Sequence, residues 1–228
     1  MTDEELALQE TAMAAERSGD LEAALDAWRA LSSINANRPD YLCKLGRVAE
    51  ELGRWAYAEK AFLDALKVDQ TLSLAKTLLG SLFLERADGD RLANARKAKE
   101  WLEPAVAIAP NQASLSFLGS AHARLGEKEA AKAAFRKVIE LDDTCAEAYF
   151  NLGLLLSADG QAIEAERLLR KAAQLDPGSH RAHGALGVLL QELGEYSEAK
   201  AELRRALEID PTDTIARRHL GLMAGDPE

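Results

Sequence analysis

Small residues recur along the chain with a period of about 34 residues, the length of a two-helix repeat, and this spacing restricts the fold more than any other feature. One series consists of glycines: Gly46, Gly80, Gly119, Gly153, Gly187 and Gly221. The other consists of alanines: Ala24, Ala58, Ala98, Ala131, Ala165 and Ala199. Both series are almost evenly spaced, apart from one longer step in the third unit. A fixed period indicates a repeat architecture, in which each unit buries its apolar face against its neighbours.

Each period contains two segments with helical spacing and a turn between them. A bulky residue follows each alanine of the series by four positions: Trp28, Phe62, Leu102, Phe135, Leu169 and Leu203. A further set of glycines falls midway through most units: Gly19, Gly53, Gly126, Gly160 and Gly194. We therefore predict two helices per unit whose backbones approach closely at the small residues, with the bulky residue filling the groove beside that contact.

The order of these residues resembles the tetratricopeptide repeat: an aromatic residue, then Leu-Gly, then Ala-x3-bulky, then Pro. Residues 146–179 show it best, with Tyr149, Leu152, Gly153, Gly160, Ala165, Leu169, Ala172 and Pro177. The resemblance implies an all-α fold, a right-handed α-α superhelix (solenoid) of six helix hairpins with a C-terminal capping helix. We expect a single domain over residues 1–228, with units at 5–38, 39–72, 73–111, 112–145, 146–179 and 180–213 and a cap at 214–228.

The third unit departs from the period because it carries about five extra residues between 85 and 98. Asp88-Gly89-Asp90 is a turn signal, and Asp88 or Asp90 could cap a lengthened second helix. The segment lacks the glycine and glutamate of a calcium-binding loop, so we expect a longer hairpin there and no metal. Pro104 lies inside the second helix and should bend it locally.

Charge and composition disfavour several classes of partner. The net charge is −10 with no basic stripe, which argues against nucleic acid, and no apolar run is long enough for membrane insertion. Acidic side chains clearly outnumber arginines over positions 1–40; they either produce a field that attracts basic partners or simply form a solvated acidic surface that keeps the protein soluble. The N-terminus does not resemble a signal peptide, and Cys43 and Cys145 should be too far apart to pair, so we expect a cytoplasmic protein with free thiols.

No enzyme motif is present, so neither catalysis nor a cofactor is expected. His180 and His183 share a helix face that a metal could use, but no third ligand is evident. His183 and His122 also occupy positions where the resembled family packs aromatic side chains. We expect all four histidines, including His219, to be packed or partly exposed structural residues.

The resemblance implies that the first helices of successive units line a concave groove that binds a peptide or protein segment. At the groove-facing positions we expect an apolar floor with polar residues beside it: Phe117, Ser120, Phe150, Asn151, Leu154, Arg181, Val188, Arg218 and Leu222. The carboxylate clamp of the family's chaperone-binding members is matched only at Asn151 and Arg181, so a co-chaperone is not predicted. The sequence favours a non-enzymatic scaffold or adaptor; the alternative is a structural protein that forms homo-oligomers through its terminal repeats.

Overall fold

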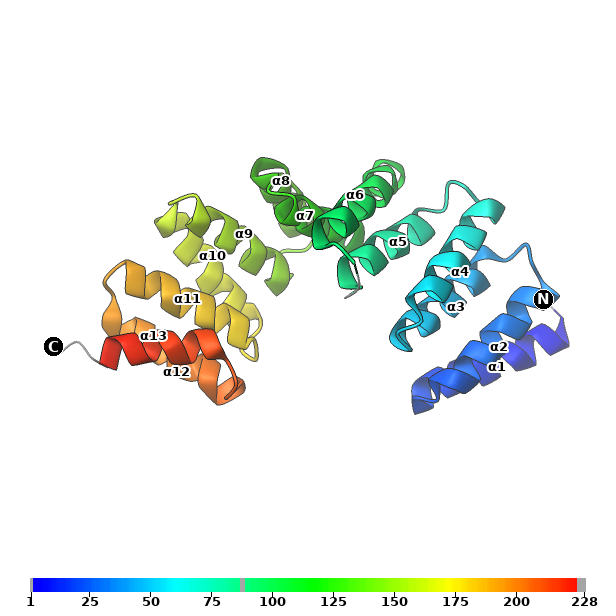
Figure 1. Cartoon of the computed structure of the whole chain (residues 1–228), viewed down its shortest axis with the longest axis horizontal. Helices are drawn as coiled ribbons and strands as arrows, with labels where there is room; N and C mark the ends of the chain where they lie inside the picture. The colour runs from blue at the N-terminus through cyan, green and yellow to red at the C-terminus, as the bar shows by residue number, and fades with distance from the viewer. Residues whose placement is uncertain (1, 87–88, 225–228) are drawn as a thin grey trace. The chain divides into compact units, whose positions relative to one another are not determined.

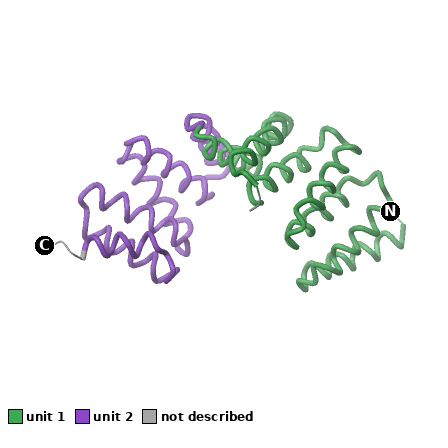
Figure 2. The backbone as a smooth tube through the Cα atoms, viewed as in Figure 1, with its two compact units in different colours: residues 1–126 green, residues 127–228 purple. Residues whose placement is uncertain are grey.

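The computed structural model describes residues 2–86 and 89–224, which form thirteen α-helices and no strand (Figure 1). The chain divides into two compact units, Met1–Gly126 and Glu127–Glu228 (Figure 2). The boundary falls at a turn inside the predicted repeat 112–145, and the expectation of one domain over the whole chain stays a prediction. None of the described helices is both long and apolar enough to cross a membrane.

Within the described residues, seven helices belong to the first compact unit and six to the second. The helices of the first are α1 (Asp3–Ser18), α2 (Leu21–Ile34), α3 (Pro39–Glu51), α4 (Trp55–Val68), α5 (Ser73–Glu85), α6 (Arg91–Ile108) and α7 (Gln112–Arg124). Those of the second are α8 (Lys128–Leu141), α9 (Ala146–Ala158), α10 (Ala162–Leu175), α11 (His180–Glu192), α12 (Tyr196–Ile209) and α13 (Thr214–Ala224). This arrangement confirms the predicted all-α solenoid of tetratricopeptide-type hairpins.

Consecutive helices pack as hairpins, and the midway glycines form their turns. In the first compact unit, α1 packs on α2, α3 on α4 and α5 on α6. In the second compact unit, α9 packs on α10 and α11 on α12. Gly19, Gly53, Gly160 and Gly194 have φ values of 78°, 70°, 75° and 83°. Glycine suits these positions because it reaches the left-handed region without the clash of a Cβ atom. The predicted turns are therefore confirmed.

The predicted close approach of the two helices is also confirmed. A Cβ atom on Gly46 would lie 2.3 Å from Cε1 of Phe62, and one on Gly80 would lie 2.3 Å from Cγ of Leu102. Both partners are the bulky residues that follow the alanine series by four positions, and both are fully buried. The small residue on one helix and the large one on the other thus form a single packing contact.

The extra residues of the third unit lengthen its second helix, as predicted. α6 has 18 residues where α4 has 14, and the Asp90 side chain caps it by accepting a hydrogen bond from the backbone N–H of Leu92 at 2.8 Å. Pro104 lies inside α6. Asp88, the other expected capping residue, lies outside the described residues.

The helix α13 occupies the place of the predicted cap. It packs against α11 and α12, and Ala216 and Met223 are buried in that contact. Gly221 continues the glycine series on α13, but apart from its chain neighbours and the adjacent backbone of α13 no described atom lies within 4 Å of a Cβ placed there. The first helix of a repeat is therefore present here without the bulky side chain that packs against the glycine in the other repeats.

Candidate functional site

The second compact unit has a cleft between α9, α11 and the start of α13. Its volume is about 490 Å³. The lining is mostly apolar: Phe150, Leu154, Leu169, Gly184, Ala185, Val188, Leu189 and Ile215, with Ser157, His180, Arg181, Thr212, Asp213 and Thr214 as its polar members. Gly184 and Ala185 create room in the floor because larger side chains at these positions would occupy the cleft. A mainly apolar concavity with a few polar groups is typical of a binding site.

Arg181 is the central polar residue of this region. Its guanidinium carbon lies 4.7 Å from the centroid of the Phe150 ring, which is 8% exposed. A second depression of about 210 Å³ adjoins the same two side chains and is also lined by Glu147, Asp176 and Ser179. Among the described residues, no carboxylate lies within ion-pair distance of Arg181. The stacked cation thus lies between two depressions, and its guanidinium makes no hydrogen bond with a described residue.

Asp213 supplies a negative charge at the edge of the larger cleft. Burial alone would raise the pKa of Asp213, but hydrogen bonds from the backbone N–H groups of Ala216 and Ile215 and the contact with His180 lower it. Its Oδ1 accepts from those N–H groups at 3.0 and 2.9 Å, so the side chain caps α13. His180 Nδ1 lies 3.0 Å from the other carboxylate oxygen. This aspartate is therefore engaged within the protein.

The histidine pair does not face a common ligand position. His180 contacts Asp213, while Nδ1 of His183 lies 2.6 Å from Oε2 of Glu202. Among the described residues, no three His, Cys, Asp or Glu side chains gather in a way that could hold a metal ion. Cys43 and Cys145 are free, the former buried and the latter half-buried.

The expected groove residues fall into three groups. Phe150, Leu154, Arg181 and Val188 line the cleft together. Asn151, Arg218 and Leu222 belong to the same compact unit but are not among its lining residues. Phe117 and Ser120 belong to the other unit, where Phe117 packs against the core and Ser120 donates a hydrogen bond to the carbonyl of Ser116. All nine assignments to a binding site stay predictions.

The start of α13 and the loop before it contribute residues that the groove prediction did not include. Thr212 and Asp213 of the loop and Thr214 of α13 line the cleft, although the repeat pattern assigns no groove-facing position to them. A capping signal was visible in the sequence, because an aspartate stands directly before the last helix. It marks where the helix begins, but it does not indicate that the cap also borders a cleft.

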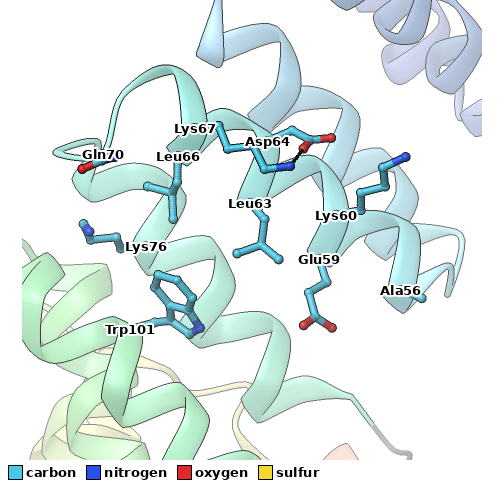
Figure 3. Close-up of a pocket in the computed structure, with 10 residues that line it drawn as sticks. All are labelled: Ala56, Glu59, Lys60, Leu63, Asp64, Leu66, Lys67, Gln70, Lys76 and Trp101. Atoms are coloured by element: carbon cyan, nitrogen blue, oxygen red, sulfur yellow. Dashed lines mark hydrogen bonds and ion pairs between the residues drawn. The ribbon is translucent and has the colours of Figure 1, made fainter.

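A second cleft, of about 630 Å³, lies between α4 and α6 in the first compact unit. Figure 3 shows Leu63 and Leu66 of α4 extending toward Trp101 of α6 across its opening. The polar residues around it are Glu59, Lys60, Asp64, Lys67, Gln70 and Lys76. The groove prediction missed this cleft because it considered only the first helices of the units, whereas α4 and α6 are second helices.

Two tetratricopeptide-repeat family models match the chain, one at residues 118–180 and the other at 156–223. A search of curated proteins found no match. The chain is similar in structure to PilF of Pseudomonas aeruginosa (16% identity, TM-score 0.82, covering 96% of this chain and 97% of that one). It is also similar to PilW, described as a widely conserved type IV pilus biogenesis factor (14% identity, TM-score 0.82, covering 96% and 100%).

A third similar structure is YrrB, described as a tetratricopeptide-repeat protein with an unusual peptide-binding site (20% identity, TM-score 0.67, covering 86% of this chain and 98% of that one). At these identities the likeness concerns the fold, not the ligand or the pathway. The matched repeat models, the helix hairpins and the close contacts at the glycine series all lead to one assignment. The chain belongs to the tetratricopeptide-repeat family.

Proposed function

We propose that this protein is a non-enzymatic scaffold that holds a segment of another protein in the cleft between α9, α11 and α13. The observation that carries the proposal is the Arg181 guanidinium, stacked on Phe150 between two depressions and without an ion-pair partner among the described residues. Carboxylates are the groups that arginine binds most strongly, by two parallel hydrogen bonds. The preferred ligand is therefore a segment that carries a carboxylate next to a large apolar side chain.

The two halves of such a ligand use different parts of the site. The carboxylate, from an acidic side chain or a chain terminus, pairs with Arg181, while the apolar side chain enters the cleft beside Leu154, Val188 and Ile215. The stack on Phe150 limits the freedom of the arginine before binding, which reduces the entropy lost when the ion pair forms. Ordering the segment itself costs about 2–5 kcal/mol, so a micromolar dissociation constant, or about −8 kcal/mol, is expected.

A peptide library tests this preference because it samples acidic and apolar residues in every order. Random 12-residue peptides are displayed with free and with blocked C-termini, selected on the full-length protein, and resynthesised with a fluorescent label for polarisation titrations. Selected peptides are expected to place Asp, Glu or a free C-terminus within a few residues of Leu, Phe, Ile or Met. The two display formats separate an acidic side chain from a chain terminus as the source of the carboxylate.

Three variants test the two halves of the site. Arg181→Gln is expected to weaken binding at least about tenfold, because a charge-assisted pair is lost. Ala185→Trp fills the cleft from a half-buried helical position and should weaken binding of peptides with the largest apolar residue most. The matched control is Arg204→Gln, which removes an exposed arginine from α12. If Arg181→Gln and Ala185→Trp bind the selected peptides as tightly as the wild type does, the proposal is wrong.

A further inference from the structure

The cleft between α4 and α6 combines an apolar floor with lysines that form no ion pair with a described residue. Leu63, Leu66 and Trp101 form the floor, and the Trp101 indole N–H makes no hydrogen bond with described protein atoms. Figure 3 shows Lys76 and Lys60 at opposite ends of the opening. A contiguous apolar floor that is open to solvent marks an interaction surface more strongly than scattered apolar residues do.

The two carboxylates at this cleft are already paired, and two of its lysines are not. Asp64 binds Lys67 with an O–N distance of 2.7 Å, and Glu59 binds Arg86 at 3.2 Å. Lys60 and Lys76 make no ion pair with any described residue, although the charge of Lys76 contributes to the lowered pKa of the nearby Asp69. In a protein of net charge −10, this local excess of positive charge favours an acidic occupant.

Helix α1 presents a surface with the opposite properties. Leu6 and Met13 are 44% and 42% exposed, and their spacing of seven residues places them on one helix face about 10 Å apart. Asp3 and Glu10 lie on the same face at helical spacing, exposed and without ion-pair partners among the described residues. The face thus alternates acid and apolar side chains: Asp3, Leu6, Glu10, Met13.

We propose that α1 of one copy of the chain docks in the cleft between α4 and α6 of a second copy. Leu6 and Met13 contact the floor formed by Leu63, Leu66 and Trp101. Asp3 and Glu10 approach Lys60 and Lys76. The occupant is a second copy because both members of this complementary pair are built into the same unit, while the net charge repels copies that meet in other orientations.

This contact joins two different surfaces, so it is heterologous unless a two-fold axis makes both copies use both surfaces at once. In the first case each added copy leaves one free α1 and one free cleft, and assembly continues with concentration. In the second case assembly stops at a dimer. The contact uses no residue of the cleft in the second compact unit, so it can succeed or fail independently of the proposed function.

Sedimentation velocity of the full-length protein at about 5 and about 500 μM, a range that brackets the dissociation constants of weak transient contacts, tests the proposal. The cleft variant is Lys60→Glu/Lys76→Glu, and the α1 variant is Asp3→Lys/Glu10→Lys. The matched control, Arg136→Glu/Lys137→Glu, makes the same charge change as the cleft variant on α8. Circular dichroism establishes that each variant is folded.

The wild type and the control are expected to exceed the monomer mass of 24.7 kDa at the higher concentration, and each variant alone is expected to remain at it. Mixing the two variants should restore association, because the intact α1 of one can enter the intact cleft of the other and the two charge-reversed surfaces also match each other. A chain that carries both sets of changes should associate again, since both charges are reversed. Higher salt should weaken association of the wild type.

Three results would overturn the proposal. The first is a wild type that remains monomeric at both concentrations. The second is a cleft variant that associates as the wild type does, because α1 then docks elsewhere. The third is a mixture of the two variants that stays monomeric. Arg181→Gln should leave association unchanged, which separates this test from that of the proposed function.

Discussion

Substituting alanine for Gly187 tests whether the glycine series sets the distance between paired helices. A Cβ atom at Gly187 would lie 2.6 Å from Cγ and 3.1 Å from the backbone N of Leu203. Carbon atoms in favourable contact lie about 3.5–4.0 Å apart, so α11 and α12 must separate or Leu203 must leave its rotamer. Such overpacking costs about 1–3 kcal/mol. The higher helix propensity of alanine offsets about 0.5–1 kcal/mol of it.

Gly221 provides the matched control, because it occupies the same position of the repeat on α13. Apart from its chain neighbours and the adjacent backbone of α13, no described atom lies within 4 Å of a Cβ placed there. Gly221→Ala therefore gains the helix propensity without the clash and should stabilise the protein by about 0.5–1 kcal/mol. The difference between the two variants isolates the packing cost of about 1–3 kcal/mol.

Urea unfolding followed by circular dichroism gives the free energies, and hydrogen exchange resolved by peptide shows whether the loss is confined to α11 and α12. Measuring Gly187→Ala also in a Leu203→Ala background tests whether the clash with Leu203 causes the loss of stability. Leu203→Ala alone should cost about 2–5 kcal/mol because Leu203 is fully buried. In the Leu203→Ala background, Gly187→Ala should cost less than in the wild type, because the contacts with Cγ and Cδ2 are gone while the 3.1 Å contact with the backbone N remains. The explanation fails if Gly187→Ala is as stable as Gly221→Ala in the wild-type background.

Two further predictions concern a carboxyl group and a turn. Burial and the nearby Glu85 raise the pKa of Glu50 to about 7, so the folded protein binds the carboxyl proton more tightly than the unfolded chain does. The stability that this proton contributes is fully present below about pH 4.3 and is lost as the pH rises through 7. Glu50→Gln should therefore stabilise the protein by ~1–2 kcal/mol at pH 8–9, a figure reduced for partial solvent access, and change little near pH 4 in urea unfolding. Gly194→Ala should destabilise by ~1 kcal/mol despite open space around it, because φ is 83° there; equal stability in a thermal melt would contradict this.

The helices, their turns and their closest contacts were predictable because each depends on residue size at a fixed spacing. A glycine opposite a bulky residue, as at Gly80 and Leu102, is a property of two positions that the period brings together in every unit. The departure in the third unit was predictable for the same reason. An insertion between two helices lengthens one of them, and Asp90 marks where the longer helix begins.

The candidate site was less predictable because it depends on side chains that cover one another. The groove-facing position of Phe150 follows from the repeat, but the Arg181 guanidinium stacks over its ring and leaves it 8% exposed. Likewise, the polar residues Thr77 and Ser81 of α5 are buried although each lies on the first helix of its repeat. A helical register gives the direction of a side chain, whereas its exposure depends on the neighbouring helix that packs over it.

In both proposed binding surfaces, a central residue lies directly beside a residue that packs the helices of the repeat together. Trp101 directly precedes Leu102, which packs against Gly80. Of these two neighbouring side chains, Leu102 therefore belongs to the core and Trp101 lines the cleft. Arg181 similarly precedes Ala182, which is buried. Because the repeat positions carry the packing, the residues between them can change without loss of the fold. The partner of such a solenoid is therefore determined at positions where its units differ, and the unit with the extra residues, which contains Trp101, differs most.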